Sequence, residues 1–190
     1  MLGAVRHEVW ALLMVSQATQ EALTDFFVSS EGFKRSKVRR DLHVTLYHAR
    51  RKMNSVADVE REVSIVTSLA NWRFMVMAPG GENPRAGIDT PNRSVGLRIQ
   101  RNSDGGIRIL QERARYTSLE TPAVLGRRTP SDTRRSAFGA RHYQPHITVL
   151  RPGAGHSTEL SDLGARLREQ SFPICFDRVV VRTKQIEGDS

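Results

Sequence analysis

The chain has 190 residues, of which 38% are hydrophobic, and its formal net charge is +9. This length suits one domain with a sizeable apolar core, so we expect residues 1–190 to form a single domain. The only cysteine, Cys175, excludes an intramolecular disulfide, and no apolar stretch is long enough for a membrane span. We therefore expect a cytoplasmic protein whose surplus of Lys and Arg favours a polyanionic partner.

The first part of the chain alternates strands and helices. Residues 10–15 form a short apolar run that predicts a buried strand, and apolar residues at helical spacing predict a helix over residues 18–27. A basic stretch at residues 34–40 precedes a second strand, residues 42–47, which is rich in β-branched and aliphatic residues. Ser55 is a favourable N-cap and predicts the start of a second helix.

The middle of the chain is more irregular. Residues 73–78 predict a strand, and the Gly-, Pro- and Asn-rich residues 79–92 predict a loop. Residues 94–100 alternate apolar and polar positions, as in a half-buried strand, whereas residues 107–116 fit either a short strand or a helix. Residues 117–141 combine several arginines with Ser, Thr, Pro and Gly, and we interpret them as a basic loop.

The last part of the chain completes the fold. A strand is predicted over residues 147–150, a helix over residues 158–169, and two closing strands over residues 172–176 and 179–182. Short strands mixed with a few helices are typical of the α+β class, in which helices pack on the outer faces of antiparallel sheets.

Two strand segments repeat one pattern of residue types. Each has a His, a β-branched aliphatic residue, a Thr and another aliphatic residue, at residues 43–46 and 146–149. Residues two apart on a strand face the same way, so His43 shares a face with Thr45. A third His-x-Thr triplet, residues 156–158, comes just before a helical run, where its hydroxyls are natural helix caps. The strand setting therefore distinguishes the first two copies.

This paired pattern, with Pro145 before the second His, resembles the two-histidine (2H) phosphoesterase superfamily, which includes the bacterial 2′-5′ RNA ligases and cyclic phosphodiesterases. The resemblance implies two pseudo-symmetric lobes, each a small antiparallel sheet with outer helices, and an active-site cleft between them. It also implies that His43 and His146 are catalytic and that Thr45 and Thr148 bind phosphate.

The chemistry of these side chains agrees with that expectation. Histidine titrates near neutral pH, so two histidines could divide the roles of general base and general acid on a phosphodiester, without a metal or cofactor. The two Thr hydroxyls could hold the non-bridging oxygens. Suitable substrates are a 2′,3′-cyclic phosphate, a 2′-5′ linkage or a cyclic oligonucleotide, and the reverse reaction is a ligation of RNA ends. The sequence leaves open which His is the base.

Three further residues are candidates for contacting an RNA or oligonucleotide substrate. Tyr47 is expected on the His43 face, Tyr143 comes three residues before His146, and Arg141 ends the basic loop. We expect a monomer with no obligatory protein partner. The alternative is a non-catalytic RNA-binding module of the same fold, in which the basic clusters matter and the histidines do not.

A metal site is the other alternative for the histidines. His142 and His146 have the spacing of two ligands on a helix, but Pro145 breaks a helix between them. The chain has no pair of cysteines and no HExxH motif. We therefore predict that no metal is bound.

Overall fold

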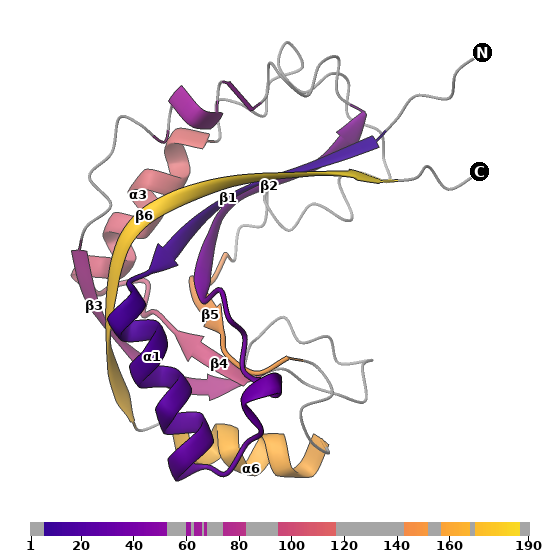
Figure 1. Cartoon of the computed structure of the whole chain (residues 1–190). Helices are drawn as coiled ribbons and strands as arrows, with labels where there is room; N and C mark the ends of the chain where they lie inside the picture. The colour runs from indigo at the N-terminus through magenta and orange to yellow at the C-terminus, as the bar shows by residue number, and fades with distance from the viewer. Residues whose placement is uncertain are drawn as a thin grey trace.

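The computed structural model describes most of the predicted elements (Figure 1). The described residues are 6–52, 60–61, 63–65, 67, 74–82, 95–116, 143–151, 157–167 and 170–186. Arg141, the rest of the basic loop at residues 117–141, and His142 lie outside them, as does most of the helix predicted to begin at Ser55. Residues 60–61, 63–65 and 67 of that predicted helix are helical.

Six described strands pair antiparallel throughout. They are β1 (Arg6–Val15), β2 (His43–Lys52), β3 (Phe74–Glu82), β4 (Val95–Arg98), β5 (His146–Thr148) and β6 (Ser171–Ile186). Their order is β1-β2-β5-β4-β3-β6, and β6 also pairs with β1, so each has two hydrogen-bonded neighbours. The order sets β2 directly beside β5, although the two strands are far apart in the chain.

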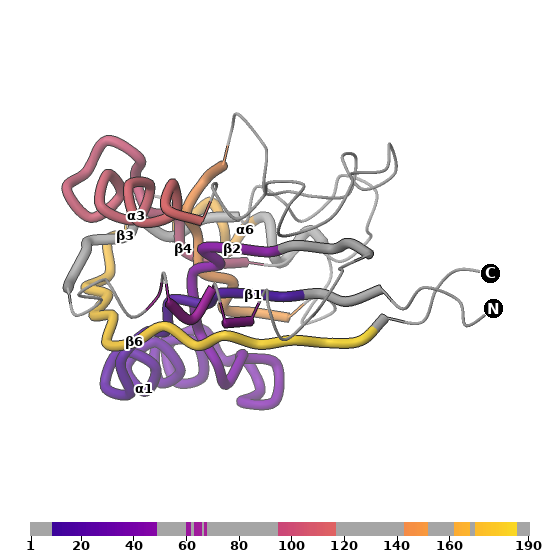
Figure 2. The backbone as a smooth tube through the Cα atoms, turned by 90° about the horizontal axis from the view of Figure 1, so that it is seen from above, coloured from indigo at the N-terminus to yellow at the C-terminus, as the bar shows by residue number. Residues whose placement is uncertain are grey.

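Helices cover this set of strands. They are α1 (Gln17–Asp25), which continues into a π-helical turn (Phe26–Ser30), α3 (Asp104–Arg115) and α6 (Ser157–Leu167). Seen from above, α1 and α3 lie on opposite sides of the strands (Figure 2). Outer helices on antiparallel strands confirm the α+β prediction, while the two-lobe pseudo-symmetry stays a prediction.

The segment that fitted either a strand or a helix is helical. Ser103 caps α3, because its hydroxyl accepts a hydrogen bond from the backbone N–H of Gly106 at 3.1 Å. Ser16 caps α1 in the same way, accepting from the N–H of Thr19. Across the part of the chain that the structure describes, none of the helices combines the length and apolar character that a membrane crossing requires.

The two closing strands predicted over residues 172–176 and 179–182 are one continuous strand, β6. Its first half pairs with β3 and its second half with β1. Met14 of β1 pairs with Arg178 and Val15 pairs with Phe176, so Asp177 is the extra residue of a β-bulge. The polar Asp177 interrupts the apolar pattern but not the strand, and the prediction of two strands was therefore wrong.

The core beneath the repeated motifs is apolar and closed. Val44, Leu46, Leu97, Ile147 and Val149 are all 0% exposed and belong to one hydrophobic cluster. The rigid strands β2, β5 and β4 thus bury one face together. Polar residues that alternate with these positions must point to the other face.

Candidate active site

The register of β2 and β5 brings the two His-x-Thr motifs together. Val44 pairs with Ile147, and because the strands are antiparallel, His43 lies opposite Thr148 and Thr45 lies opposite His146. All four are partly exposed, while Val44 and Ile147 between them are buried. Cross-strand neighbours have Cβ atoms about 5 Å apart. Two imidazoles and two hydroxyls therefore form one compact group on a single face.

The neighbouring strand β4 completes this face. Arg98 pairs with His146 and Gly96 pairs with Thr148, while Leu97 between them is buried. Paired residues share a face of the sheet, so the exposed Arg98 lies beside His146 and Gly96 leaves the space beside Thr148 without a side chain. Sequence reasoning missed Arg98, because only the pairing of β4 with β5 places it there.

Both imidazoles are oriented in the same way. The Nδ1 of His43 lies 2.6 Å from the backbone carbonyl of Asp41, and the Nδ1 of His146 lies 2.8 Å from the carbonyl of Gln144. A carbonyl only accepts, so each Nδ1 carries the hydrogen and donates it. Each Nε2 is then the nitrogen that takes up or releases a proton. In both motifs the accepting carbonyl belongs to the residue two positions before the His. This equal spacing could have been read from the sequence.

His43 has an additional charged neighbourhood. Arg182 of β6 pairs with the Asp41 carboxylate at 2.7 Å. Burial lowers the pKa of His43, with smaller contributions in the same direction from the charges of Arg39 and Arg182, and these outweigh the Asp41 contacts, which raise it. The pKa of Asp41 is lowered as well: burial would raise it, but the Arg182 hydrogen bond and the nearby positive charges prevail. The lowered pKa favours the neutral form of His43.

Tyr143 connects the two motifs instead of lining an open cleft. Its side chain is 4% exposed, and its hydroxyl donates a 2.6 Å hydrogen bond to the backbone carbonyl of Thr45. The Arg113 guanidinium of α3 lies over the ring at 4.2 Å from its centroid. The expectation that Tyr143 contacts substrate is thus corrected, since the ring is covered and its hydroxyl is engaged in holding the first motif.

Tyr47 does not share the His43 face. It is 0% exposed and stacks on Tyr116 with ring centroids 5.7 Å apart. The reason is a second β-bulge: Leu12 of β1 pairs with Thr45 and Ala11 pairs with Tyr47, which leaves Leu46 as an extra residue. The bulge shifts the alternation by one position and turns Tyr47 into the core, so the prediction that it contacts substrate was wrong.

Among the described residues, no further histidine joins the two motif histidines in a cluster of metal ligands. His48 stacks on Trp10 with ring centroids 5.0 Å apart, and His142 lies outside the described residues. Within the ranges that the structure describes, no three His, Cys, Asp or Glu side chains gather as metal ligands. That the reaction is independent of metal stays a prediction.

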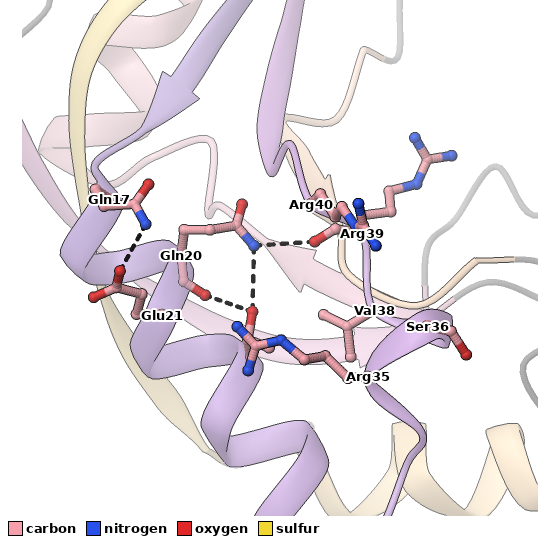
Figure 3. Close-up of a pocket in the computed structure, with 9 residues that line it drawn as sticks. Gln17, Gln20, Glu21, Arg35, Ser36, Val38, Arg39 and Arg40 are labelled. Atoms are coloured by element: carbon pink, nitrogen blue, oxygen red, sulfur yellow. Dashed lines mark hydrogen bonds between the residues drawn. The ribbon is translucent and has the colours of Figure 1, made fainter.

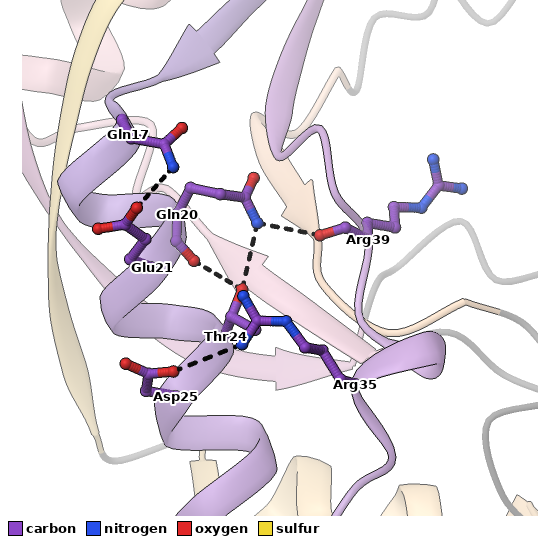
Figure 4. Close-up of polar contacts among 7 residues, drawn as sticks. All are labelled: Gln17, Gln20, Glu21, Thr24, Asp25, Arg35 and Arg39. Carbon is purple, nitrogen blue, oxygen red and sulfur yellow. Dashed lines mark hydrogen bonds and ion pairs between the residues drawn. The ribbon is translucent and has the colours of Figure 1, made fainter.

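A pocket of about 360 Å³ lies next to the first motif (Figure 3). It is formed between α1 and the segment that leads into β2, and it contains none of the four motif residues. Gln20 of α1 connects these two walls. Its amide oxygen accepts from the N–H of Leu42 at 2.8 Å. Its amide nitrogen donates to the carbonyl of Arg39 at 3.0 Å, as Figure 4 shows. Gln20 therefore fixes the backbone that positions His43.

Comparison with known proteins places the fold. No family model matches the chain, and a search of curated proteins finds no match. Among solved structures, LigT from E. coli in its apo form matches with a TM-score of 0.51 at 14% identity, covering 96% of this chain and 94% of that one. A structure described as a phosphoesterase matches at 0.49 and 15% identity, covering 94% of both chains. TT0787 of Thermus thermophilus matches at 0.48 and 17% identity, covering 95% of this chain and 87% of its own.

LigT is a member of the two-histidine phosphoesterase superfamily that the sequence resembles. The chain therefore has the two-histidine phosphoesterase fold, which confirms the fold expected from the resemblance. An identity of 14% carries the fold and no more. The function has to be argued from the residues of the site.

Proposed function

We propose that this protein is a metal-independent phosphodiesterase in which His43 and His146 transfer protons and Thr45 and Thr148 hold the phosphate. The observation that carries the proposal is the register of β2 and β5, which sets each His opposite the Thr of the other motif. A phosphate seated over this face would meet a hydroxyl and an imidazole from each side.

The proton transfers follow from the orientation of the two rings. One His, neutral, takes a proton at Nε2 from the attacking water, and the other, protonated, gives one from Nε2 to the departing oxygen. The backbone carbonyls of Asp41 and Gln144 keep Nδ1 occupied as a donor, so that both rings present Nε2. After one turnover the two rings have exchanged protonation states, and exchange with water restores them.

Charge stabilisation falls to the groups around the phosphate. The hydroxyls of Thr45 and Thr148 donate to the non-bridging oxygens as negative charge builds up. Arg98, opposite His146, adds a positive charge at the edge of the same face. Buried Val44 and Ile147 hold the strands rigidly beneath, which gives the fixed geometry that such a site requires.

The substrate class we infer is a 2′,3′-cyclic phosphate or a 2′-5′ linkage in RNA or a cyclic oligonucleotide, with ligation of RNA ends as the reverse reaction. The net charge of +9 and the resemblance of the motifs support a nucleic-acid substrate. Two-histidine chemistry on a 2′,3′-cyclic end also needs no metal: one imidazole takes a proton from the water that attacks phosphorus, and the other gives a proton to the ribose oxygen whose bond to phosphorus breaks.

A panel of substrates tests the proposal. Adenosine 2′,3′-cyclic phosphate, 2′-5′ oligoadenylate and 3′-5′ oligoadenylate would each be incubated with the protein in excess EDTA. We expect hydrolysis of at least one of the first two, unchanged by the chelator. Salt-sensitive RNA binding with no turnover of any diester would instead identify the non-catalytic RNA-binding module, and turnover that EDTA abolishes would refute metal independence.

A further inference from the structure

Arg39 has a backbone that is held firmly from two sides. Its N–H donates to the carbonyl of Val149 at 2.8 Å, just after β5, and its carbonyl accepts from Gln20 of α1 at 3.0 Å. The position of this residue relative to both motifs is therefore fixed. Figure 4 shows that the side chain of Arg39 extends away from α1, in the direction opposite to its carbonyl.

The guanidinium of Arg39 forms no salt bridge among the described residues, although its charge helps to lower the pKa of Asp41. Its Nε is buried and makes no hydrogen bond there. The carboxylate of Asp41, two residues on, already pairs with Arg182 at 2.7 Å. Arg39 as a whole is partly exposed, but a buried donor on a permanently charged group is costly to leave unpaired and is normally matched by an acceptor. No residue in the described ranges supplies a hydrogen-bonded anion to the Arg39 Nε.

The place of Arg39 in the fold indicates where the anion would come from. Its hydrogen bond to Val149 lies one residue beyond Thr148, at the end of the motif face where His43 and Thr148 oppose each other. Its charge also helps to lower the pKa of His43, which agrees with its being close to the site. The backbone of Arg39 is thus next to the end of the motif face that carries His43 and Thr148.

We infer that Arg39 binds a second phosphate of the substrate, one nucleotide away from the diester that is cleaved. The inference rests on the proposed function and narrows its substrate class: the preferred substrate is an oligonucleotide with neighbouring phosphates, in place of a lone cyclic mononucleotide. A planar guanidinium can donate two parallel hydrogen bonds to one phosphate, so Arg is well suited to binding a phosphate group.

A binding assay tests the inference without depending on turnover. Isothermal titration would compare adenosine 3′-phosphate, which has one phosphate, with the dinucleotide ApAp, which has two. The quantity of interest is the ratio of their dissociation constants in the wild type and in two variants. Arg39→Gln removes the charge under study, and Arg40→Gln is the matched control, because Arg40 is adjacent but exposed.

We expect Arg39→Gln to reduce the preference for ApAp about tenfold, the usual effect of losing one charged hydrogen-bonding contact, with Arg40→Gln leaving it unchanged. Arg39→Lys keeps the positive charge but cannot donate two parallel hydrogen bonds. Its preference for ApAp should therefore lie between those of Arg39→Gln and the wild type. Thermal unfolding of each variant checks that the fold is retained.

Three results would overturn the inference. The first is that both dissociation constants in Arg39→Gln equal those of the wild type. The second is an equal weakening of both ligands, which would place Arg39 at the scissile phosphate, and the third is a wild type that binds neither ligand. The same experiments distinguish a failure of this inference from a failure of the proposed catalytic function. If ApAp binds through Arg39 but no diester is hydrolysed, the phosphate subsite stands and the catalytic proposal fails.

Discussion

Gly96 occupies a position where a single added methyl group would disturb the second motif. It pairs with Thr148, and a Cβ built on it would overlap the carbonyl oxygen of Ile147. The same Cβ would lie 3.0 Å from the Ile147 carbonyl carbon and 3.1 Å from the Thr148 Cα. These contacts are all with backbone, so β5 itself would have to move. Gly96→Ala therefore perturbs the site without removing any of its functional groups.

The size of the effect follows from the displacement that relieves the overlap. Bringing the Cβ to an ordinary van der Waals distance shifts β5 by about 1 Å, and a misplacement of that size costs about a hundredfold in rate. Overpacking of a closed core also destabilises a fold by about 1–3 kcal/mol. We expect Gly96→Ala to fold at 20 °C but to hydrolyse its substrate about a hundredfold more slowly.

Hydrolysis of adenosine 2′,3′-cyclic phosphate and urea denaturation measure the two effects separately. Gly32→Ala serves as the matched control. Gly32 has a φ of 72°, which strains an alanine by about 1–2 kcal/mol, but its added Cβ would meet no neighbouring atom within 4 Å. This control should lose stability and keep its kcat. A Gly96→Ala enzyme with wild-type kcat would refute the reasoning that β5 is held at this position.

Two further predictions concern the neighbours of the motifs. Tyr143→Phe removes the hydroxyl that donates to the Thr45 carbonyl. It should lower the free energy of unfolding, measured by urea denaturation, by about 1–2 kcal/mol, and it should lower kcat about tenfold. An unchanged kcat would refute the positioning role of Tyr143. The pH dependence of kcat/KM should respond to the charges near His43. Arg182→Gln removes a charge that lowers the pKa of His43, so the limb that reports His43 should move to higher pH, whereas Asp41→Asn removes a charge that raises it and should move the same limb to lower pH. Shifts in one common direction would contradict this electrostatic account.

Local sequence patterns predicted the strand setting of the motifs well. The alternation of apolar and polar residues put Val44 and Ile147 in the core and their His and Thr neighbours on the other face, as observed. That prediction needs only the geometry of one strand at a time. The α+β class followed in the same way from the succession of short strands and helices.

The errors arose where the pairing of strands changed that local geometry. A bulge at Leu46 turned Tyr47 into the core, and a bulge at Asp177 kept β6 continuous through a polar residue. Bulges depend on the partner strand, so alternation within one segment does not reveal them. The roles of Arg98 and Tyr143 depend on contacts across the fold and for that reason were not predictable either.

The central claim is that His43 and His146 act as one catalytic unit. Hydrolysis of adenosine 2′,3′-cyclic phosphate in excess EDTA, by the wild type, His43→Ala, His146→Ala and the double variant, tests it most directly. We predict that each single substitution lowers kcat at least about a thousandfold and that the double substitution adds little, because groups that act together are not additive. Turnover by either single variant within tenfold of the wild type, with the fold intact by circular dichroism, would contradict the claim.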